Sequence, residues 1–288
     1  MNPYLSIVLS GRNDAYGQDF LHRFQICINN LLYLNNKYDL DAELIIVEWN
    51  PPKNRRNLRD IIKWPKYIKP DIVRIIQVPN KIHRRVKSSD NTPFREYMAK
   101  NVGICRAKGK FILATNADLL FNEELIRFLA SKKLSEENFY RIDRFDVAKL
   151  VPSHISVEEQ LKFCEKNAFM QRVNNGFKWL KIFPQIKYLI YSIHFRLKNL
   201  LSNVKARQYS KEESFTPKPD ILHIHAAGDF FLMARQYWET IKGYPELESS
   251  YYIDGYPCFM AEVLGLKQIV LKEPLKIFHQ EHSRSLSI

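Results

Sequence analysis

The stretch from residue 94 to residue 118, FREYMAKNVGICRAKGKFILATNAD, decides the fold class of this chain. Residues 94–107 show helical periodicity, and Gly109 follows them as glycine commonly follows the end of a helix. A short apolar run over 111–114 comes next and ends in the polar cluster Thr115–Asp118. The pattern therefore predicts a helix that leads into a buried strand, with polar side chains at the carboxyl end of that strand.

Strand and helix signals continue on both sides of this stretch. Apolar runs of the same kind predict further buried strands at 5–9, 44–47, 72–78, 230–233, 268–271 and 275–278. Segments with helical spacing, such as 20–32, lie between several of them. This order predicts an α/β fold with a mostly parallel central sheet and helices on both faces. Sheets of that kind bind ligands beyond the carboxyl ends of their strands.

The composition is that of a folded protein. The chain has 288 residues, of which 45% are hydrophobic and 26% are charged, so it can bury a sizeable core and is not mainly disordered. No apolar run approaches the ~20 residues that a membrane-spanning helix needs. None of the four cysteines forms a CxxC pair. This disfavours a zinc knuckle and favours a reduced, cytoplasmic setting.

Positive charge is concentrated in one segment. The chain has 44 basic and 31 acidic residues, a net charge of +13. Residues 162–211 contain eleven basic residues and one acid, Glu165, and they are rich in aromatic side chains. Such a segment suits an anionic membrane surface or, less well, single-stranded nucleic acid. Alternatively, it is a solvated insertion whose aromatic residues pack on the main domain. We expect one domain over 1–288 with a basic helical insertion at about 155–215.

Two polar clusters offer ligands for a metal ion. Asp118 directly follows a buried strand, and a carboxylate there can hold Mg²⁺ or Mn²⁺. The alternative is that Asp118 caps the helix expected from Glu123. His279 and His282 lie three residues apart after the last strand, where imidazoles can bind metal or phosphate. The alternative for this pair is a frayed polar terminus.

Two further carboxylates adjoin glycines in loops. Asp229 follows Gly228, and Asp254 precedes Gly255. Loops carry functional residues more often than cores do, so both are candidates for acid–base chemistry. An ordinary Asp-Gly turn is the alternative for Asp254.

Taken together, these motifs resemble the GT-A fold glycosyltransferases and, among them, the family 2-like enzymes. The matching motifs are the helix Ala99–Ile104 (AKNVGI), the strand and DxD-type motif FILATNAD, and residues 228–246, GDFFLMARQYWETIKGYPE. The resemblance covers 5–144 and 223–282 but not the basic insertion. It departs from the family pattern at Asn116, which replaces an aspartate, at the Trp49–Pro52 run after Glu48, and at Ile253, which precedes Asp254 where a glutamate is usual.

The resemblance implies an inverting transfer of a sugar from a nucleotide-sugar donor to a glycan or lipid-linked acceptor, with Mn²⁺ or Mg²⁺. The cation would be held by Asp118, His279 and His282. The general base would be Asp254, with Asp229 as second choice. The donor-binding residues would be Ser10, Arg12, Asp14, Glu48, Arg84 (or Arg85), Asn101 and Asn116. A lipid-linked acceptor would place the enzyme peripherally at the inner face of a membrane.

Two other classes of protein fit parts of the pattern. A nucleotidyltransferase acting on a sugar phosphate uses the same kind of scaffold and metal, but its usual glycine-rich first loop with Lys and Arg is not seen. A non-enzymatic, basic nucleic-acid-binding protein would leave the two metal-binding motifs without a role.

Overall fold

The computed structural model describes residues 2–14, 18–68, 72–86, 92–174, 176–181, 222–247 and 253–282. The helices are α1 Phe20–Lys37, α2 Leu58–Ile61, α3 Asn80–His83, α4 Glu96–Ile104, α5 Glu123–Ala130, α6 Val157–Asn167, α8 Arg235–Ile241, the 3₁₀ turn η2 Ile253–Gly255 and α9 Tyr256–Val263. The strands are β1 Leu5–Gly11, β2 Ala42–Trp49, β3 Val73–Val78, β4 Phe111–Thr115, β5 Leu119–Phe121, β6 Asn138–Ile142, β7 Arg144–Val147, β8 Ala168–Val173, β9 Gly176–Trp179, β10 Phe230–Ala234, β11 Lys267–Leu271 and β12 Ile277–Gln280.

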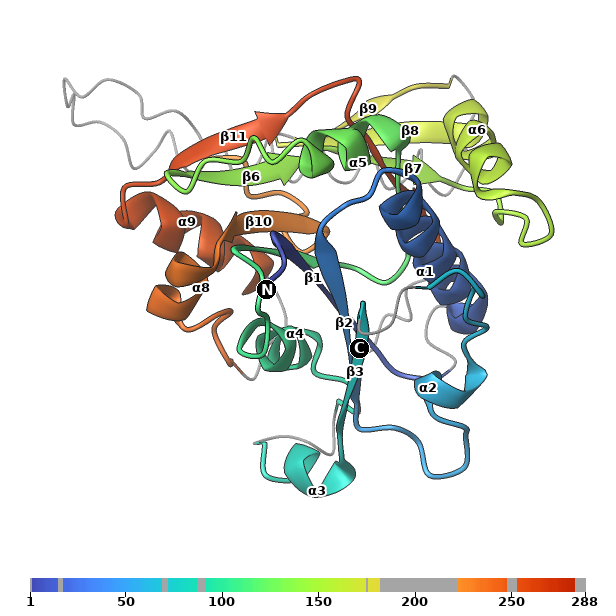
Figure 1. Ribbon diagram of the computed structural model, residues 1–288, viewed down its shortest axis with the longest axis horizontal. Coiled ribbons are helices and arrows are strands. Elements are labelled where there is room, and N and C mark those ends of the chain that lie inside the picture. The colour runs from blue at the N-terminus through green and yellow to red at the C-terminus, as the bar shows by residue number, and fades with distance from the viewer. Residues whose placement is uncertain are drawn as a thin grey trace, which may run out of the picture.

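A seven-stranded sheet forms the centre of the molecule, in the order β11-β6-β10-β4-β1-β2-β3. Every neighbouring pair is parallel except those of β10, which runs antiparallel to β4 and to β6 (Figure 1). The predicted mostly parallel sheet is therefore confirmed. Its carboxyl edge carries the ends of β1 and β4 and, because β10 is reversed, the beginning of β10.

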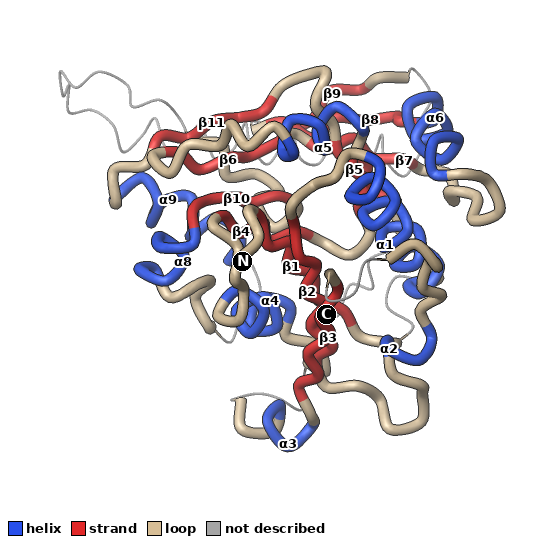
Figure 2. Tube along the Cα trace, in the orientation of Figure 1, coloured by secondary structure: helices blue, strands red, loops and turns tan. Residues whose placement is uncertain are grey.

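Helices cover both faces of this sheet, as predicted. Alternate side chains of a strand point to opposite faces, and β1 shows this clearly. Ile7 and Leu9 belong to the hydrophobic cluster under α1, whereas Val8 belongs to the cluster under α4. The views in Figures 1 and 2 show α1 on one side of β1–β3, with α4, α8 and α9 on the other.

A glycine allows α4 to lie close against the sheet. A Cβ atom added at Gly103 would lie 2.5 Å from Val8 Cγ1 and 3.2 Å from Val47 Cγ2. Any larger residue there would push the helix away from β1 and β2. The glycine of the AKNVGI motif therefore sets the distance between helix and sheet.

A second sheet, in the order β5-β12-β7-β8-β9, lies beside the first and brings distant parts of the chain together. In it, His279 of β12 is opposite Leu119 of β5 on one side and Asp146 of β7 on the other. The hairpin of β8 and β9 extends this sheet antiparallel to β7.

The expected helical insertion at 155–215 is only partly described. It begins with α6, whose Ser156 and Glu159 form a capping box, but it continues as the β8–β9 hairpin rather than as helix. Trp179, one of the aromatic residues of the basic segment, ends β9, and its ring centroid lies 6.1 Å from that of the buried Phe169. Apolar residues at helical spacing also predict a long helix around 186–201, and this stretch lies outside the described residues.

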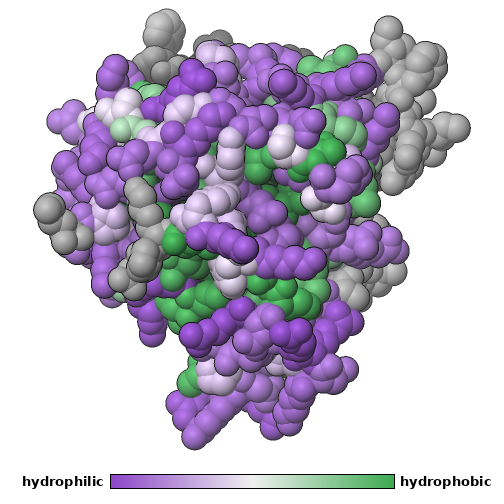
Figure 3. Space-filling view, turned by 45° about the vertical axis from the view of Figure 1, so that its right-hand side comes forward, coloured by the Kyte–Doolittle hydropathy of each residue, from purple (hydrophilic) through white to green (hydrophobic). Residues whose placement is uncertain are grey.

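Hydrophilic side chains dominate the face shown in Figure 3, and hydrophobic ones gather towards its lower centre. Within the described part of the chain, no helix combines the length and the hydropathy that crossing a membrane requires.

Candidate active site

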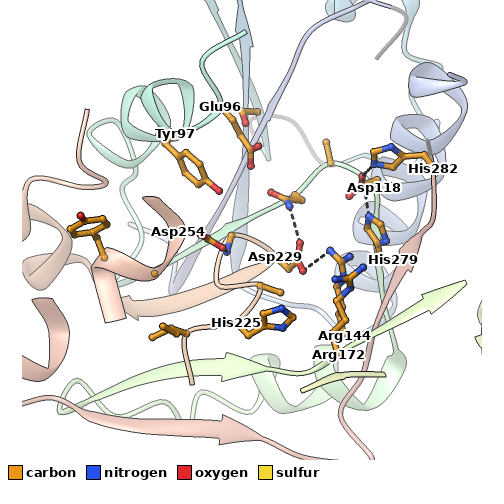
Figure 4. Close-up of a pocket in the computed structure, with 18 of the residues that line it drawn as sticks. Glu96, Tyr97, Asp118, Arg144, Arg172, His225, Asp229, Asp254, His279 and His282 are labelled. Carbon is orange, nitrogen blue, oxygen red and sulfur yellow. Dashed lines mark hydrogen bonds and ion pairs between the residues drawn. The ribbon is translucent and has the colours of Figure 1, made fainter. Parts of the chain in front are cut away.

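A pocket of about 830 Å³ opens at the carboxyl edge of the central sheet. Seven of the residues predicted from sequence line it, and they come from widely separated parts of the chain: Ser10, Asn116, Asp118, Asp229, Asp254, His279 and His282. Figure 4 shows most of them converging on one space, with Asp118 and the two histidines on one side and Asp254 on the other. The pocket thus lies where parallel sheets usually bind ligands.

Asp118, His279 and His282 form a cluster of potential metal ligands. Asp118 Oδ2 lies 3.6 Å from His279 Nε2 and 3.2 Å from His282 Nε2. One ligand atom from each of the three residues lies within 4.8 Å of those of the other two. The side chains of both histidines are less than a tenth exposed, so the pair is not part of a frayed terminus.

The remaining contacts of this cluster suit a divalent cation. His279 Nδ1 lies 3.0 Å from Asp146 Oδ1, which leaves Nε2 facing Asp118 and His282. A carboxylate behind a metal-binding histidine fixes the ring in this way. Asp118 Oδ1 is buried and accepts no hydrogen bond from the described part of the chain. One carboxylate and two imidazoles suit Mn²⁺ better than Mg²⁺, which prefers oxygen ligands.

The electrostatics of the cluster are those of closely coupled opposite charges. Burial alone would raise the pKa of Asp118, but His279 and His282 outweigh it and hold that pKa well below its usual range. Burial and Arg144 act to lower the pKa of His279, yet Asp118 and Asp146 outweigh them and raise it to about 10. Without a cation, the positive charge of protonated His279 therefore offsets the negative charges of Asp118 and Asp146.

Asp118 does not cap α5. Asn122 does so, because its Oδ1 accepts a hydrogen bond from Leu125 N–H at 3.1 Å. The alternative role for Asp118 is therefore excluded, and its side chain is left to face the pocket.

Asn116 connects Lys100 with Asp229. Its Oδ1 accepts a hydrogen bond from Lys100 Nζ at 2.6 Å, and its Nδ2 donates to Asp229 Oδ1 at 2.8 Å. Lys100 is fully buried, and its Nζ also contacts Glu96 Oε1 and the carbonyl of Gly228. With its oxygen already bonded to an ammonium, Asn116 orients the neighbouring groups rather than adding a metal ligand.

The two candidate bases differ in their surroundings. Asp229 is buried, and its Oδ2 forms an ion pair with Arg144 Nη1 at 2.8 Å, so both of its oxygens are engaged. Asp254 is only half-buried, and its Oδ2 accepts one hydrogen bond, from Gly228 N–H at 3.1 Å. Asp254 is therefore the carboxylate that is more open to the pocket.

A buried arginine holds the loop that carries Asp229. Arg141 of β6 is fully buried and donates to the carbonyls of His223, His225, Ala227 and Phe230. These four bonds fix the path of 223–230, which brings His225 to the pocket wall. Burial lowers the pKa of His225 to about 4, so its ring is neutral at pH 7.

Five of the predicted donor-binding residues do not line the pocket, and the structure gives several of them other contacts. Arg12 Nη1 pairs with Asp14 at 2.7 Å, and Arg12 Nε donates to the carbonyl of Asn50. Glu48 is buried, accepts a hydrogen bond from Leu58 N–H at 2.8 Å and so holds the start of α2. Arg84 and Arg85 are exposed beyond the end of α3.

Asn101, the fifth, connects α4 to the turn after α8. Its Oδ1 accepts from Tyr244 N–H at 2.7 Å, and its Nδ2 donates to the carbonyl of Tyr244 at 2.9 Å. Gly243 has φ +79°, and a Cβ there would lie 2.3 Å from Asn101 Oδ1. The two motifs AKNVGI and KGYPE therefore meet in one structural contact.

Several polar residues around the pocket were not predicted. They are Lys100, Arg144, Asp146 and Arg172. Lys100 lies inside a predicted helix, and the alternation of charged and apolar residues in RIDRFDV was a signal for the strand that carries Arg144 and Asp146. Nothing in the sequence indicated that Arg172 would face this strand.

Comparisons with known proteins give structural neighbours only. No family model matches the sequence, and no curated protein matches it. Residues 1–349 of TarS from S. aureus align with a TM-score of 0.54 and 12% identity, over 97% of this chain and 60% of that one. A longer TarS structure aligns with a TM-score of 0.51 and 13% identity, over 98% of this chain and 37% of that one. The mannosyltransferase PcManGT from Pyrobaculum calidifontis was solved with GDP-Man and Mn²⁺. It aligns with a TM-score of 0.49 and 13% identity, over 100% of this chain and 59% of that one.

The fold is GT-A-like. At these identities the similarity concerns the fold alone, and the chain spans about 60% of the length of the first structure. The resemblance noted from sequence is confirmed at the level of the fold. No family model or curated protein supports assignment to family 2.

Proposed function

We propose that the protein is a glycosyltransferase that transfers a sugar from a nucleotide-sugar donor with the help of a divalent cation. One observation carries the proposal. On a GT-A-like sheet, the cluster of Asp118, His279 and His282 shares a pocket with the accessible carboxylate of Asp254. A cation site and a nearby base are the two features that this chemistry requires of a protein.

On the donor side, Asp118, His279 and His282 would hold the cation, and Mn²⁺ fits their ligand set best. When bound, the cation stabilises the negative charge that develops on the leaving diphosphate. Ser10, at the carboxyl end of β1, lines the pocket and would contact the nucleotide or the ribose. Asn116 and Lys100 would keep Asp229 and the Gly228 carbonyl in place around the sugar.

On the acceptor side, Asp254 would act as the general base. It lies in the pocket opposite the metal cluster in Figure 4, and it is less tightly engaged than Asp229. A base that takes a proton from the acceptor hydroxyl fits a single displacement, hence inversion at the sugar carbon. The acceptor would be a glycan or a lipid-linked sugar, the latter at the inner face of a membrane, with the basic segment 162–211 near anionic lipid.

Replacement of Asp254 by Asn tests the assignment of the base. Asp254→Asn should retain donor affinity and lose turnover by ~10²–10⁴-fold, because it removes the proton acceptor and not a donor contact. The measurement combines calorimetric titration of nucleotide sugars with a product assay on candidate acceptors.

Asp229→Asn is the matched variant, since it neutralises the other carboxylate of the pocket. It should also disturb the ion pair with Arg144, so its folding is checked by thermal unfolding. If turnover survives in Asp254→Asn and disappears in a folded Asp229→Asn, the two roles are exchanged. Production of a nucleotide sugar from a nucleoside triphosphate and a sugar phosphate would instead identify a nucleotidyltransferase.

A further inference from the structure

Two arginines lie opposite each other on neighbouring strands of the second sheet, at the wall of the pocket. Arg144 of β7 and Arg172 of β8 are register partners on antiparallel strands, and both line the pocket. Like charges directly opposite each other on neighbouring strands are destabilising. Arg144 is buried, and the side chain of Arg172 is only 14% exposed, so water screens this repulsion weakly.

The carboxylates that bind these arginines do not use all of their donors. Asp146 is fully buried and contacts three side chains: Arg144 Nε at 2.9 Å, Arg172 Nε at 2.8 Å and His279 Nδ1 at 3.0 Å. Asp146 is thus shared by two guanidinium groups and an imidazole, and Glu281 Oε2 lies 3.5 Å from the same imidazole nitrogen. Among the described residues, Asp229 forms an ion pair with Arg144 Nη1, and its other oxygen accepts a hydrogen bond from Asn116.

Guanidinium nitrogens therefore remain for a ligand. Arg144 Nη2 is buried and has no hydrogen-bond partner among the residues that the structure describes. In the described part of the chain, Nε is the Arg172 nitrogen that pairs with a carboxylate. A phosphate group is the anion that best matches two forked, permanently charged donors. Figure 4 shows both arginines between Asp229 and His279, which puts such an anion beside the cation cluster.

We propose that Arg172, together with Arg144, forms an anion subsite of the pocket that binds a phosphate group next to the divalent cation. The chemistry fits the diphosphate of a donor and equally a phosphate carried by an acceptor. The assignment of that phosphate rests on the proposed function. Binding of the anion itself does not, because it can be measured without any transfer.

The test uses the full chain with metal chelated and inorganic pyrophosphate as the probe, followed by titration calorimetry. Wild-type protein should bind pyrophosphate, and Arg172→Gln should bind it at least about tenfold more weakly. Arg172→Lys, which keeps the charge but not the fork, should fall between the two. Arg127→Gln is the matched control, because Arg127 is an exposed arginine paired with Glu123 outside the pocket, and it should bind like wild type.

A purely structural role for Arg172 has a different signature. Loosening Asp146 would weaken Mn²⁺ binding through His279 and lower the midpoint of thermal unfolding. We expect Arg172→Gln to retain Mn²⁺ affinity within about twofold, since Arg144 and His279 still hold Asp146. Wild-type protein that ignores pyrophosphate, equal pyrophosphate binding by wild type and Arg172→Gln, or parallel loss of Mn²⁺ and anion binding would each overturn the subsite.

Competition identifies the source of the phosphate. If UDP, GDP or dTDP with Mn²⁺ displaces pyrophosphate, the subsite holds the diphosphate of the donor. If glycerol 3-phosphate binds through Arg172 while a nucleoside diphosphate is bound, the subsite holds a phosphate of the acceptor. Either result supports the subsite.

Discussion

At the scale of single residues, buried carboxylates are held by hydrogen bonds from the backbone as well as by positive charge. Glu43 of β2 is the clearest case outside the pocket. Its Oε1 accepts hydrogen bonds from Lys108 N–H at 2.6 Å and from the Ser6 hydroxyl at 2.7 Å, and its Oε2 pairs with Arg74 at 2.8 Å. Burial alone would raise the pKa of Glu43, but these three contacts outweigh it and lower the pKa.

The lowered pKa predicts a pH-dependent contribution of Glu43 to stability. A carboxylate with a depressed folded-state pKa stabilises the fold above its unfolded pKa of ~4.3, and this stabilisation is lost as the pH falls through the folded-state value. Glu43→Gln should therefore lower the free energy of unfolding by about 1–3 kcal/mol at pH 7 and by less in acid. Urea unfolding between pH 3 and pH 7 measures this. Glu137→Gln, at an exposed position, is the control, and an equal loss at both pH values would contradict the prediction.

Sequence patterns predicted some of the pocket residues and not others, and the difference depends on where each residue lies relative to its strand. Asp118 and His279 could be predicted because each directly follows or ends an apolar strand, where polar residues stand out. Arg144 and Asp146 could not, because they lie within a strand, where a charged residue signals exposure unless its partner is known. Glu48 also ends a strand, but its hydrogen bond to Leu58 N–H depends on a loop whose path the sequence does not reveal.

At the scale of elements, contacts between helices and loops explain motifs that resemble those of an enzyme family. Asn101 was predicted to bind the donor, yet it forms two hydrogen bonds with the backbone of Tyr244. We predict that Asn101→Ala lowers the free energy of unfolding by about 2–3 kcal/mol, because it leaves a buried N–H and a buried carbonyl unpaired. Chemical denaturation measures this loss.

The same variant separates the structural role of Asn101 from the binding role. Donor affinity of folded Asn101→Ala should stay near that of wild type. Asn57→Ala is a suitable control, because Asn57 precedes α2 without a capping bond from its side chain. Unchanged stability together with lost nucleotide binding would restore the original assignment of Asn101.

The elements themselves were predicted to different degrees. All strands of the central sheet except β6 follow from apolar runs, α1 and α4 follow from helical spacing, and these elements are present. Apart from β12, the second sheet was not predicted. β5 has only three residues, and β7 and β9 have four each and mix charged with apolar side chains. Short strands of this kind are stabilised by tertiary pairing, which leaves little periodicity to detect.

At the scale of the whole molecule, the net charge of +13 bears on where the protein acts. If the acceptor is lipid-linked, the intact chain should bind anionic liposomes at low salt and leave them as salt rises, because each Lys or Arg contributes only ~1 kcal/mol and is screened over roughly 8–10 Å. Flotation with anionic and with neutral liposomes is the measurement. Absence of co-flotation with anionic lipid at low salt would contradict binding of this protein to a membrane surface.

The central claim is that Asp118, His279 and His282 bind a divalent cation that a nucleotide-sugar donor needs. The most direct test is titration calorimetry of wild type, Asp118→Asn and the exposed control Asp60→Asn, with Mn²⁺ and with UDP-, GDP- and dTDP-sugars. One donor should bind wild type and Asp60→Asn only when Mn²⁺ is present. Asp118→Asn should remain folded but bind Mn²⁺ at least about tenfold more weakly, because even an outer-shell partner of a ligand is worth that much. Undiminished Mn²⁺-dependent donor binding by Asp118→Asn, or donor binding by wild type that is the same without metal, would contradict the account.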